Sequence, residues 1–141
     1  MNVDMNESAE ISDWYIEILD WLLMDQEPLC MLIRNAIIDQ PKDKQDQYRE
    51  LVLENVGEAL EKGDAVLRCR HTCMESNCRS MWTEAVRRHR ATAIALYYPA
   101  DPTDHFHERC GGDVTVCLTE QGRRLLSRVR NERPGQARGK V

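Results

Sequence analysis

Apolar residues recur at three- and four-residue spacing in three segments of the first half of the chain, which is the pattern of amphipathic helices. The first predicted helix begins at a cap supplied by Ser8 or Ser12 and ends near Asp25. The second covers about residues 28–39 and the third about residues 44–62. The apolar positions of the first helix are Ile11, Trp14, Tyr15, Ile18, Leu19, Leu22 and Leu23.

Two residues favour these helix ends. Pro28 fits the first turn of the second helix, because its fixed φ is helical and its missing N–H has no partner there. Gly63 fits the end of the third helix, because glycine adopts the left-handed conformation without a Cβ penalty.

The second half of the chain mixes strand and helix patterns. Alternating apolar residues predict strands over 64–71 (DAVLRCRH) and 113–119 (DVTVCLT). Residues 79–90 have the spacing of a helix, while residues 91–98 (ATAIALYY) fit either a continuation of that helix or a strand. A short basic helix follows over 120–129.

The length of 141 residues fits one domain. We expect a flexible N-terminus over 1–8, a folded domain over 9–130 and a disordered basic tail over 131–141. The first ten residues lack the basic and apolar regions of a secretory signal, and the apolar stretch from Trp14 to Met24 is too short and too charged to span a membrane. These features predict a soluble cytoplasmic protein with reduced cysteines and no membrane partner.

Two segments carry a family resemblance. Residues 56–70 (VGEALEKGDAVLRCR) resemble the end of a recognition helix that passes into a first wing strand, and residues 113–129 (DVTVCLTEQGRRLLSRV) resemble a second wing strand and the helix after it. The chain thus resembles the winged-helix domain of bacterial multiple-antibiotic-resistance-regulator-type proteins. The resemblance implies a mainly helical α+β fold, with three N-terminal helices, a two-stranded antiparallel wing with a long insertion at about 72–112, and a short C-terminal helix. It also implies DNA binding in transcription regulation, and a homodimer formed through terminal helices.

The Leu-Thr-Glu sequence at the start of the last helix has a direct physical interpretation. Leu118 would fill the core at the end of the strand, and the Thr119 hydroxyl would cap the helix. Glu120 would lie at the positive end of the helix dipole.

Charge divides the chain into two unlike halves. Residues 1–66 hold sixteen acidic residues and five lysines and arginines, a net charge of −11. Residues 67–141 hold eight acidic residues and fourteen lysines and arginines, a net charge of +6. The second half would then bind nucleic acid or an acidic partner, or the two halves would attract each other within one chain or between two copies.

The third predicted helix departs from the family, because it is acidic. Phosphate neutralisation supplies much of DNA affinity, so an acidic helix would be repelled from the groove. The two main alternatives are therefore DNA binding through the basic second half and a protein-interaction or dimerisation module that has lost DNA binding. The candidate nucleic-acid-binding residues are Arg87, Arg88, Arg90, Arg123 and Arg124.

The cysteines and histidines of the insertion suggest a third alternative, a small protein stapled by zinc. If the strands at 64–71 and 113–119 pair, the two ends of the insertion come together, and four soft ligands could bind zinc tetrahedrally. No CxxC pair supports this, so buried or surface thiols with solvated histidines are the competing interpretation. The candidate ligands are Cys73, Cys78, His107 and Cys110.

No pattern in the sequence favours catalysis. Several cysteine–histidine pairs are present, but nothing selects one of them as nucleophile and base. Gly111 and Gly112 form an isolated turn rather than a phosphate-binding loop. We therefore expect a binding protein that is not an enzyme and that needs no cofactor unless the zinc site forms.

Overall fold

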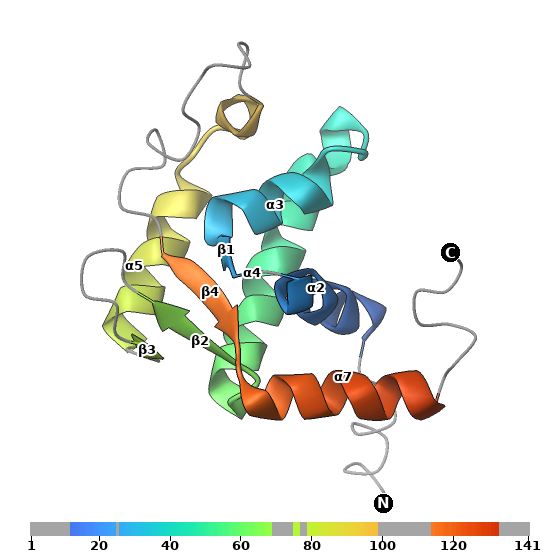
Figure 1. Ribbon diagram of the computed structural model, residues 1–141. Helices are drawn as coiled ribbons and strands as arrows, with labels where there is room; N and C mark the ends of the chain where they lie inside the picture. The colour runs from blue at the N-terminus through green and yellow to red at the C-terminus, as the bar shows by residue number, and fades with distance from the viewer. Residues whose placement is uncertain (1–11, 25, 69–74, 77–78, 99–113, 133–141) are drawn as a thin grey trace, which may run out of the picture.

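The computed structural model describes residues 12–24, 26–68, 75–76, 79–98 and 114–132. The described chain is mainly helical, with a small antiparallel sheet on one side of the helices (Figure 1). The elements are, in order, α2 (Asp13–Met24), β1 (Glu27–Pro28), α3 (Leu29–Ile37), η1 (Lys42–Lys44), α4 (Gln45–Lys62), β2 (Ala65–Arg68), β3 (Glu75–Ser76), α5 (Arg79–Arg90), η2 (Ile94–Tyr97), β4 (Thr115–Leu118) and α7 (Glu120–Glu132).

The sheet contains the predicted strand pair and two short strands that were not predicted. β2 pairs antiparallel with β4, with Ala65 opposite Leu118 and Arg68 opposite Thr115. β1 adds to the outer edge of β4 and β3 to the outer edge of β2, which gives the order β1-β4-β2-β3. The prediction of a sheet of only two strands was wrong, because strands of two residues are too short to show a period-two pattern.

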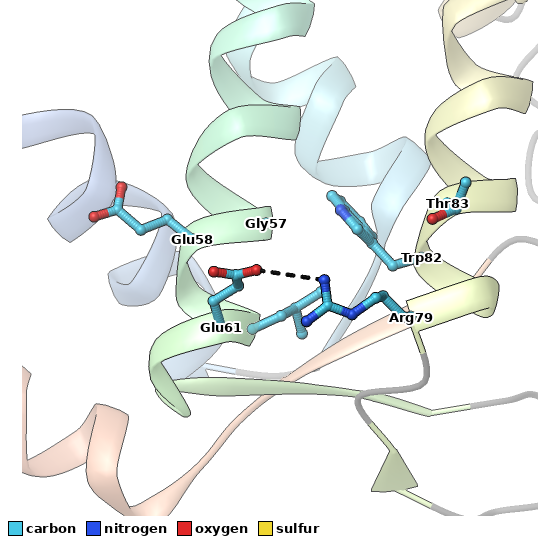
Figure 2. A pocket seen from close by; sticks show the side chains of 7 residues that line it. Gly57, Glu58, Glu61, Arg79, Trp82 and Thr83 are labelled. Carbon is cyan, nitrogen blue, oxygen red and sulfur yellow. Dashed lines mark ion pairs between the residues drawn. The ribbon is translucent and has the colours of Figure 1, made fainter.

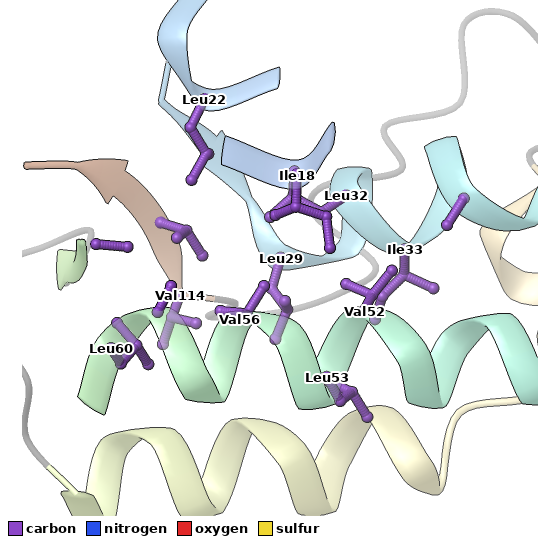
Figure 3. Close-up of a cluster of buried hydrophobic side chains, with 14 of the residues drawn as sticks. Ile18, Leu22, Leu29, Leu32, Ile33, Val52, Leu53, Val56, Leu60 and Val114 are labelled. Atoms are coloured by element: carbon purple, nitrogen blue, oxygen red, sulfur yellow. The ribbon is translucent and has the colours of Figure 1, made fainter. Parts of the chain in front are cut away.

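The core lies where α2, α3 and α4 pack together against the inner face of the sheet (Figure 3). Each helix has the apolar spacing that the sequence predicts, and burial of these stripes supplies most of the folding free energy. The largest fully buried residues are Tyr97, Ile18, Leu19, Leu29, Leu32, Ile33, Ile37, Leu67, Leu126, Val52, Val56 and Val116.

Several predicted helix ends are confirmed. The Ser12 hydroxyl accepts a hydrogen bond from the Tyr15 N–H at 3.1 Å, so Ser12 caps α2. Gly63 ends α4 with a φ of 87°, in the left-handed region. Thr119 accepts a hydrogen bond from the Gly122 N–H at 3.0 Å and so caps α7.

Two segments end differently from the prediction. α7 continues to Glu132, so the proposed tail boundary at residue 131 was wrong; Arg130 pairs with Asp20 of α2 and holds the last turns of α7 against the domain. Residues 91–98 are neither a continued α-helix nor a strand, because α5 ends at Arg90 and a short 3-10 helix follows.

A buried carboxylate joins the elements that meet at the end of α4. Asp64 is 3% exposed, and its two side-chain oxygens accept hydrogen bonds from the Tyr15 hydroxyl of α2 and, at 2.8 Å, from the Gln121 amide of α7. Its backbone accepts from the Thr119 N–H at 3.1 Å. The start of β2 is thereby bonded to the first and the last helix.

Gly122 is required by the same junction. A Cβ at this position would overlap the backbone carbonyl oxygen of Asp64 and crowd the Leu118 side chain. The glycine of the Leu-Thr-Glu-Gln-Gly sequence therefore allows α7 to approach the β2 backbone, a contact that no side chain would permit.

We predict that Gly122→Ala destabilises the protein by about 1–3 kcal/mol, because the added methyl group forces the helix away from the Asp64 carbonyl. In an unconstrained helix the same change would stabilise by up to about 1 kcal/mol, so the sign of the effect is diagnostic. Urea unfolding measures it, with Ser127→Ala on the exposed face of α7 as the control. A Gly122→Ala protein as stable as the parent would contradict the close approach.

We also predict that Tyr15 makes stability fall at alkaline pH. Burial, and then the hydrogen bond to Asp64, raise the pKa of the Tyr15 hydroxyl well above its usual value. Because the folded state holds this proton more tightly than the unfolded state, the stabilisation is complete below pH of about 10 and falls by about 1.4 kcal/mol per pH unit above it. Tyr15→Phe should cost about 1–3 kcal/mol at neutral pH, and the difference from the parent should shrink above pH of about 10.

Urea unfolding at several pH values tests this, with Tyr48→Phe as the matched control because Tyr48 is partly exposed. A Tyr15→Phe effect that stays constant from neutral to alkaline pH would contradict the assigned role of the hydroxyl.

Candidate functional site

The helix that the family resemblance assigns to DNA is covered along its outer side by α5 (Figure 1). Trp82 of α5 lies directly on Gly57 of α4, where an added Cβ would be only 3.3 Å from the indole Nε1. At the C-terminal end of α5, Arg90 donates hydrogen bonds to both carboxylate oxygens of Glu50 on α4, at 2.9–3.2 Å. α4 thus packs against α2 and α3 on one side, and Trp82 and Arg90 of α5 lie along its other side.

The C-terminal end of α5 and the segment after it are firmly anchored. Arg49, a mostly buried residue of α4, donates to the Thr92 carbonyl oxygen at 2.7 Å. The hydroxyl of Tyr97, which is fully buried, lies 2.6 Å from His89 Nδ1. Tyr98 accepts from the Gln45 amide at 2.7 Å. Buried hydrogen bonds of this kind hold the cover in place more strongly than exposed ion pairs do.

The charge difference between the two halves of the sequence is explained in part by ion pairs within the chain. Acidic residues of the first half pair with arginines of the second half in three places: Glu50 with Arg90, Glu61 with Arg79, and Asp20 with Arg130. Attraction between the halves within one molecule, one of the interpretations left open by the sequence, is therefore present in the structure.

The predicted arginines of α5 are largely engaged by these contacts. Arg90 is held by Glu50, and Arg87 forms a two-point contact with Glu84 one turn earlier, a contact that lowers the pKa of Glu84. Arg88 is partly buried and also makes contacts within the chain. These three side chains would have to give up existing partners before they could bind phosphate.

The predicted arginines of α7 lie on a separate element. α7 packs on α2 and β4, whereas α5 packs beside α4, so the structure does not bring the two groups together on one helix face. Arg123 and Arg124 are exposed, and Arg124 lies 3.7 Å from Glu120 in a loose ion pair. Arg123 and Arg128 have no ion-pair partner among the residues that the structure describes.

An open groove of about 690 Å³ lies between the last turns of α4 and the first turns of α5 (Figure 2). Leu60 and Trp82 give it apolar surface, and Glu61 and Arg79 give it charge. Arg79 and Glu61 reach toward each other across it, with a separation of 4.0 Å. The groove lies at the first turns of α5, away from the C-terminal end that the Arg49 hydrogen bond to Thr92 anchors.

The exposed side of α2 carries an aromatic cluster. Trp14 contacts Trp21 edge-on, with ring centroids 6.2 Å apart, and Tyr48 of α4 at 5.6 Å. These three rings are partly exposed, and Met24, on the same helix face as Trp21, is 85% exposed. Trp21 lies two helical turns after Trp14, and Met24 lies three residues after Trp21, so the three side chains form one stripe along α2.

Neither the groove nor the aromatic stripe was predicted as a site from the sequence. The one local signal for the groove is Gly57 in the middle of a helix, where glycine costs about 1 kcal/mol relative to alanine and so indicates a close neighbour. The one sequence feature that relates to the aromatic stripe is that the first predicted helix has more apolar residues than one buried face needs.

The predicted zinc ligands Cys73, Cys78, His107 and Cys110 lie outside the described residues, so the zinc site stays a prediction. In the part of the chain that the structure describes, no group of three or more His, Cys, Asp or Glu side chains is placed to hold a metal ion. The side chains of Cys30 and Cys117 are buried, and the Cys117 thiol donates a hydrogen bond to the Gln26 amide oxygen at 3.2 Å.

Comparison with known protein families, curated proteins and solved structures gives no match to this chain. Among the described residues, no helix has the length and apolar character needed to cross a membrane. Function must therefore be argued from the surfaces described above.

Proposed function

We propose that this chain is a non-catalytic protein-binding module, built on a winged-helix-like scaffold, that pairs with a second copy through α2. Three features support the scaffold: three successive N-terminal helices, an antiparallel pair of β2 and β4 with an insertion between them, and a helix directly after β4. The observation that carries the functional proposal is the position of α5 on the outer side of α4.

The cover removes the usual DNA-reading surface. A recognition helix needs a free face to enter the major groove, and α4 presents that face to Trp82 and Arg90 instead. The negative residues of α4 would also repel phosphates if α5 were displaced. Both observations favour a protein partner over DNA at this helix.

The α2 stripe supports self-association. A methionine that is 85% exposed, beside two partly exposed tryptophans, is the composition that protein interfaces favour over the rest of a surface. Tryptophan is also one of the residues that contribute most to binding energy at protein interfaces. A twofold pair would bring the same stripe of each copy together.

We predict a dimeric mass by light scattering at tens of micromolar protein, and a monomeric mass for Met24→Glu. The substitution places a charge in the centre of the proposed contact, while an exposed side chain contributes little to folding. Ile38→Glu, which changes another exposed apolar residue outside α2, is the control and should stay dimeric. A monomeric parent protein would rule out the pairing through α2.

DNA binding through α7 is a second candidate function, because Arg123 and Arg128 are free of ion pairs in the described part of the chain. Fluorescence anisotropy of a random-sequence duplex, at low and moderate salt, separates the two candidates. The protein-binding proposal predicts no micromolar binding at moderate salt. Salt-sensitive binding lost in Arg123→Gln/Arg124→Gln, but kept in Arg87→Gln/Arg88→Gln, would favour α7 as a DNA contact instead.

A further inference from the structure

We propose that the groove between α4 and α5 binds an arginine-bearing segment, and that its occupant is residues 133–141 of a second copy. This site is distinct from the α2 stripe and goes beyond the pairing proposed above. The shape of the groove, the charges along α4 and the composition of the segment support this assignment.

The groove presents an aromatic wall. Gly57 lets the Trp82 indole lie against α4, and the ring stays partly exposed beside Leu60. A tryptophan face is the best side-chain surface for stacking a guanidinium, because the ring quadrupole attracts the cation. An arginine would therefore find both a stacking surface and an apolar floor for its methylene groups.

Glu61 supplies a carboxylate to the groove, because its side chain reaches from α4 toward Arg79, whereas Glu58 points away on the other side of α4 (Figure 2). Lys62 neutralises Glu58 at 2.8 Å, but Glu61 has only the loose contact with Arg79, whose side chain is 88% exposed. An ion pair at 4.0 Å between exposed side chains is weak, so an incoming guanidinium can replace Arg79 at small cost.

The chain itself supplies a matching ligand. Residues 133–141 (RPGQARGKV) contain Arg133, Arg138 and Lys140 and no acidic residue. α7 begins beside the end of α4 and runs away from α5 (Figure 1), so the end of α7 that precedes this segment lies far from the groove of its own molecule. We therefore assign the occupant to a second copy.

The test is a titration of a synthetic peptide of residues 133–141 into a Trp14→Phe/Trp21→Phe protein, in which Trp82 is the only remaining tryptophan. Low protein concentration keeps the groove free of segments from other copies. We expect a saturable change in Trp82 emission that weakens with added salt. A peptide with glutamine at 133, 138 and 140 should give no such change. Calorimetry on the unsubstituted protein gives the same comparison if the double variant does not fold.

Two single substitutions must act in opposite directions. Glu61→Gln should weaken peptide binding by up to about fivefold, the upper range for one exposed ion pair. Arg79→Gln should strengthen it, because the competing cation is gone. Absence of saturable binding, equal binding of the neutral peptide, or weaker binding by Arg79→Gln would overturn the proposal. Met24→Glu, which alters only the α2 stripe, should leave peptide binding unchanged, so failure of the dimer and failure of this site are separable.

Discussion

The buried Asp64 carboxylate is the constraint on which the arrangement of this chain depends. It follows directly after the left-handed Gly63, so the chain leaves α4, turns and begins β2 within two residues. A buried charge without partners would be costly, and here it accepts hydrogen bonds from the first helix and from the last. Tyr15 and Gln121 therefore fix α2 and α7 relative to β2. Two helices far apart in the sequence are thus bonded to one side chain.

The junction also determines which surfaces remain for function. With α2 and α7 fixed at one end of α4, the inner side of α4 is filled by the apolar core, and only its outer side is left. The insertion between β2 and β4 covers that side through α5. The strongest attachments of α5 and the segment after it are the buried contacts around Arg49 and Tyr97. The exposed ion pairs to Glu50 and Glu61 fix the position of α5 more than they stabilise the fold. What stays accessible is the face of α2, the face of α7 and the groove at the start of α5.

Periodicity predicted the elements of this fold well because most of them are long enough to show it. The helices now seen at 13–24, 29–37, 45–62 and 79–90 each carry an apolar stripe, and Gly63 and Thr119 end or begin helices through local chemistry. β1 and β3 escaped prediction because two-residue strands exist only through their partners. The role of Asp64 also escaped it, since an aspartate after a helix-ending glycine looks like an ordinary solvated turn residue.

The candidate site was less predictable than the fold. The acidic residues of α4 predict repulsion of DNA from this helix, but no pattern in the residues indicates that α5 lies along it. Glu84 and Arg87 are three residues apart on the helix predicted over 79–90, so their pairing could be inferred from spacing. The pairing of Arg90 with Glu50 is identified only by the structure, because the two residues lie on different helices. Pairing between distant segments is a tertiary property that composition cannot show.

The position of α5 on α4 is the central claim, and one nuclear Overhauser measurement tests it most directly. A Cβ added at Gly57 would lie 3.3 Å from the Trp82 indole nitrogen, so the Gly57 α-protons and the indole N–H proton should be close enough to give a cross-peak in the free protein. A clear cross-peak, with slow amide exchange along the outer side of α4, is the predicted result. Absence of the cross-peak, with rapidly exchanging amides along α5, would show that α4 is uncovered and would contradict the account.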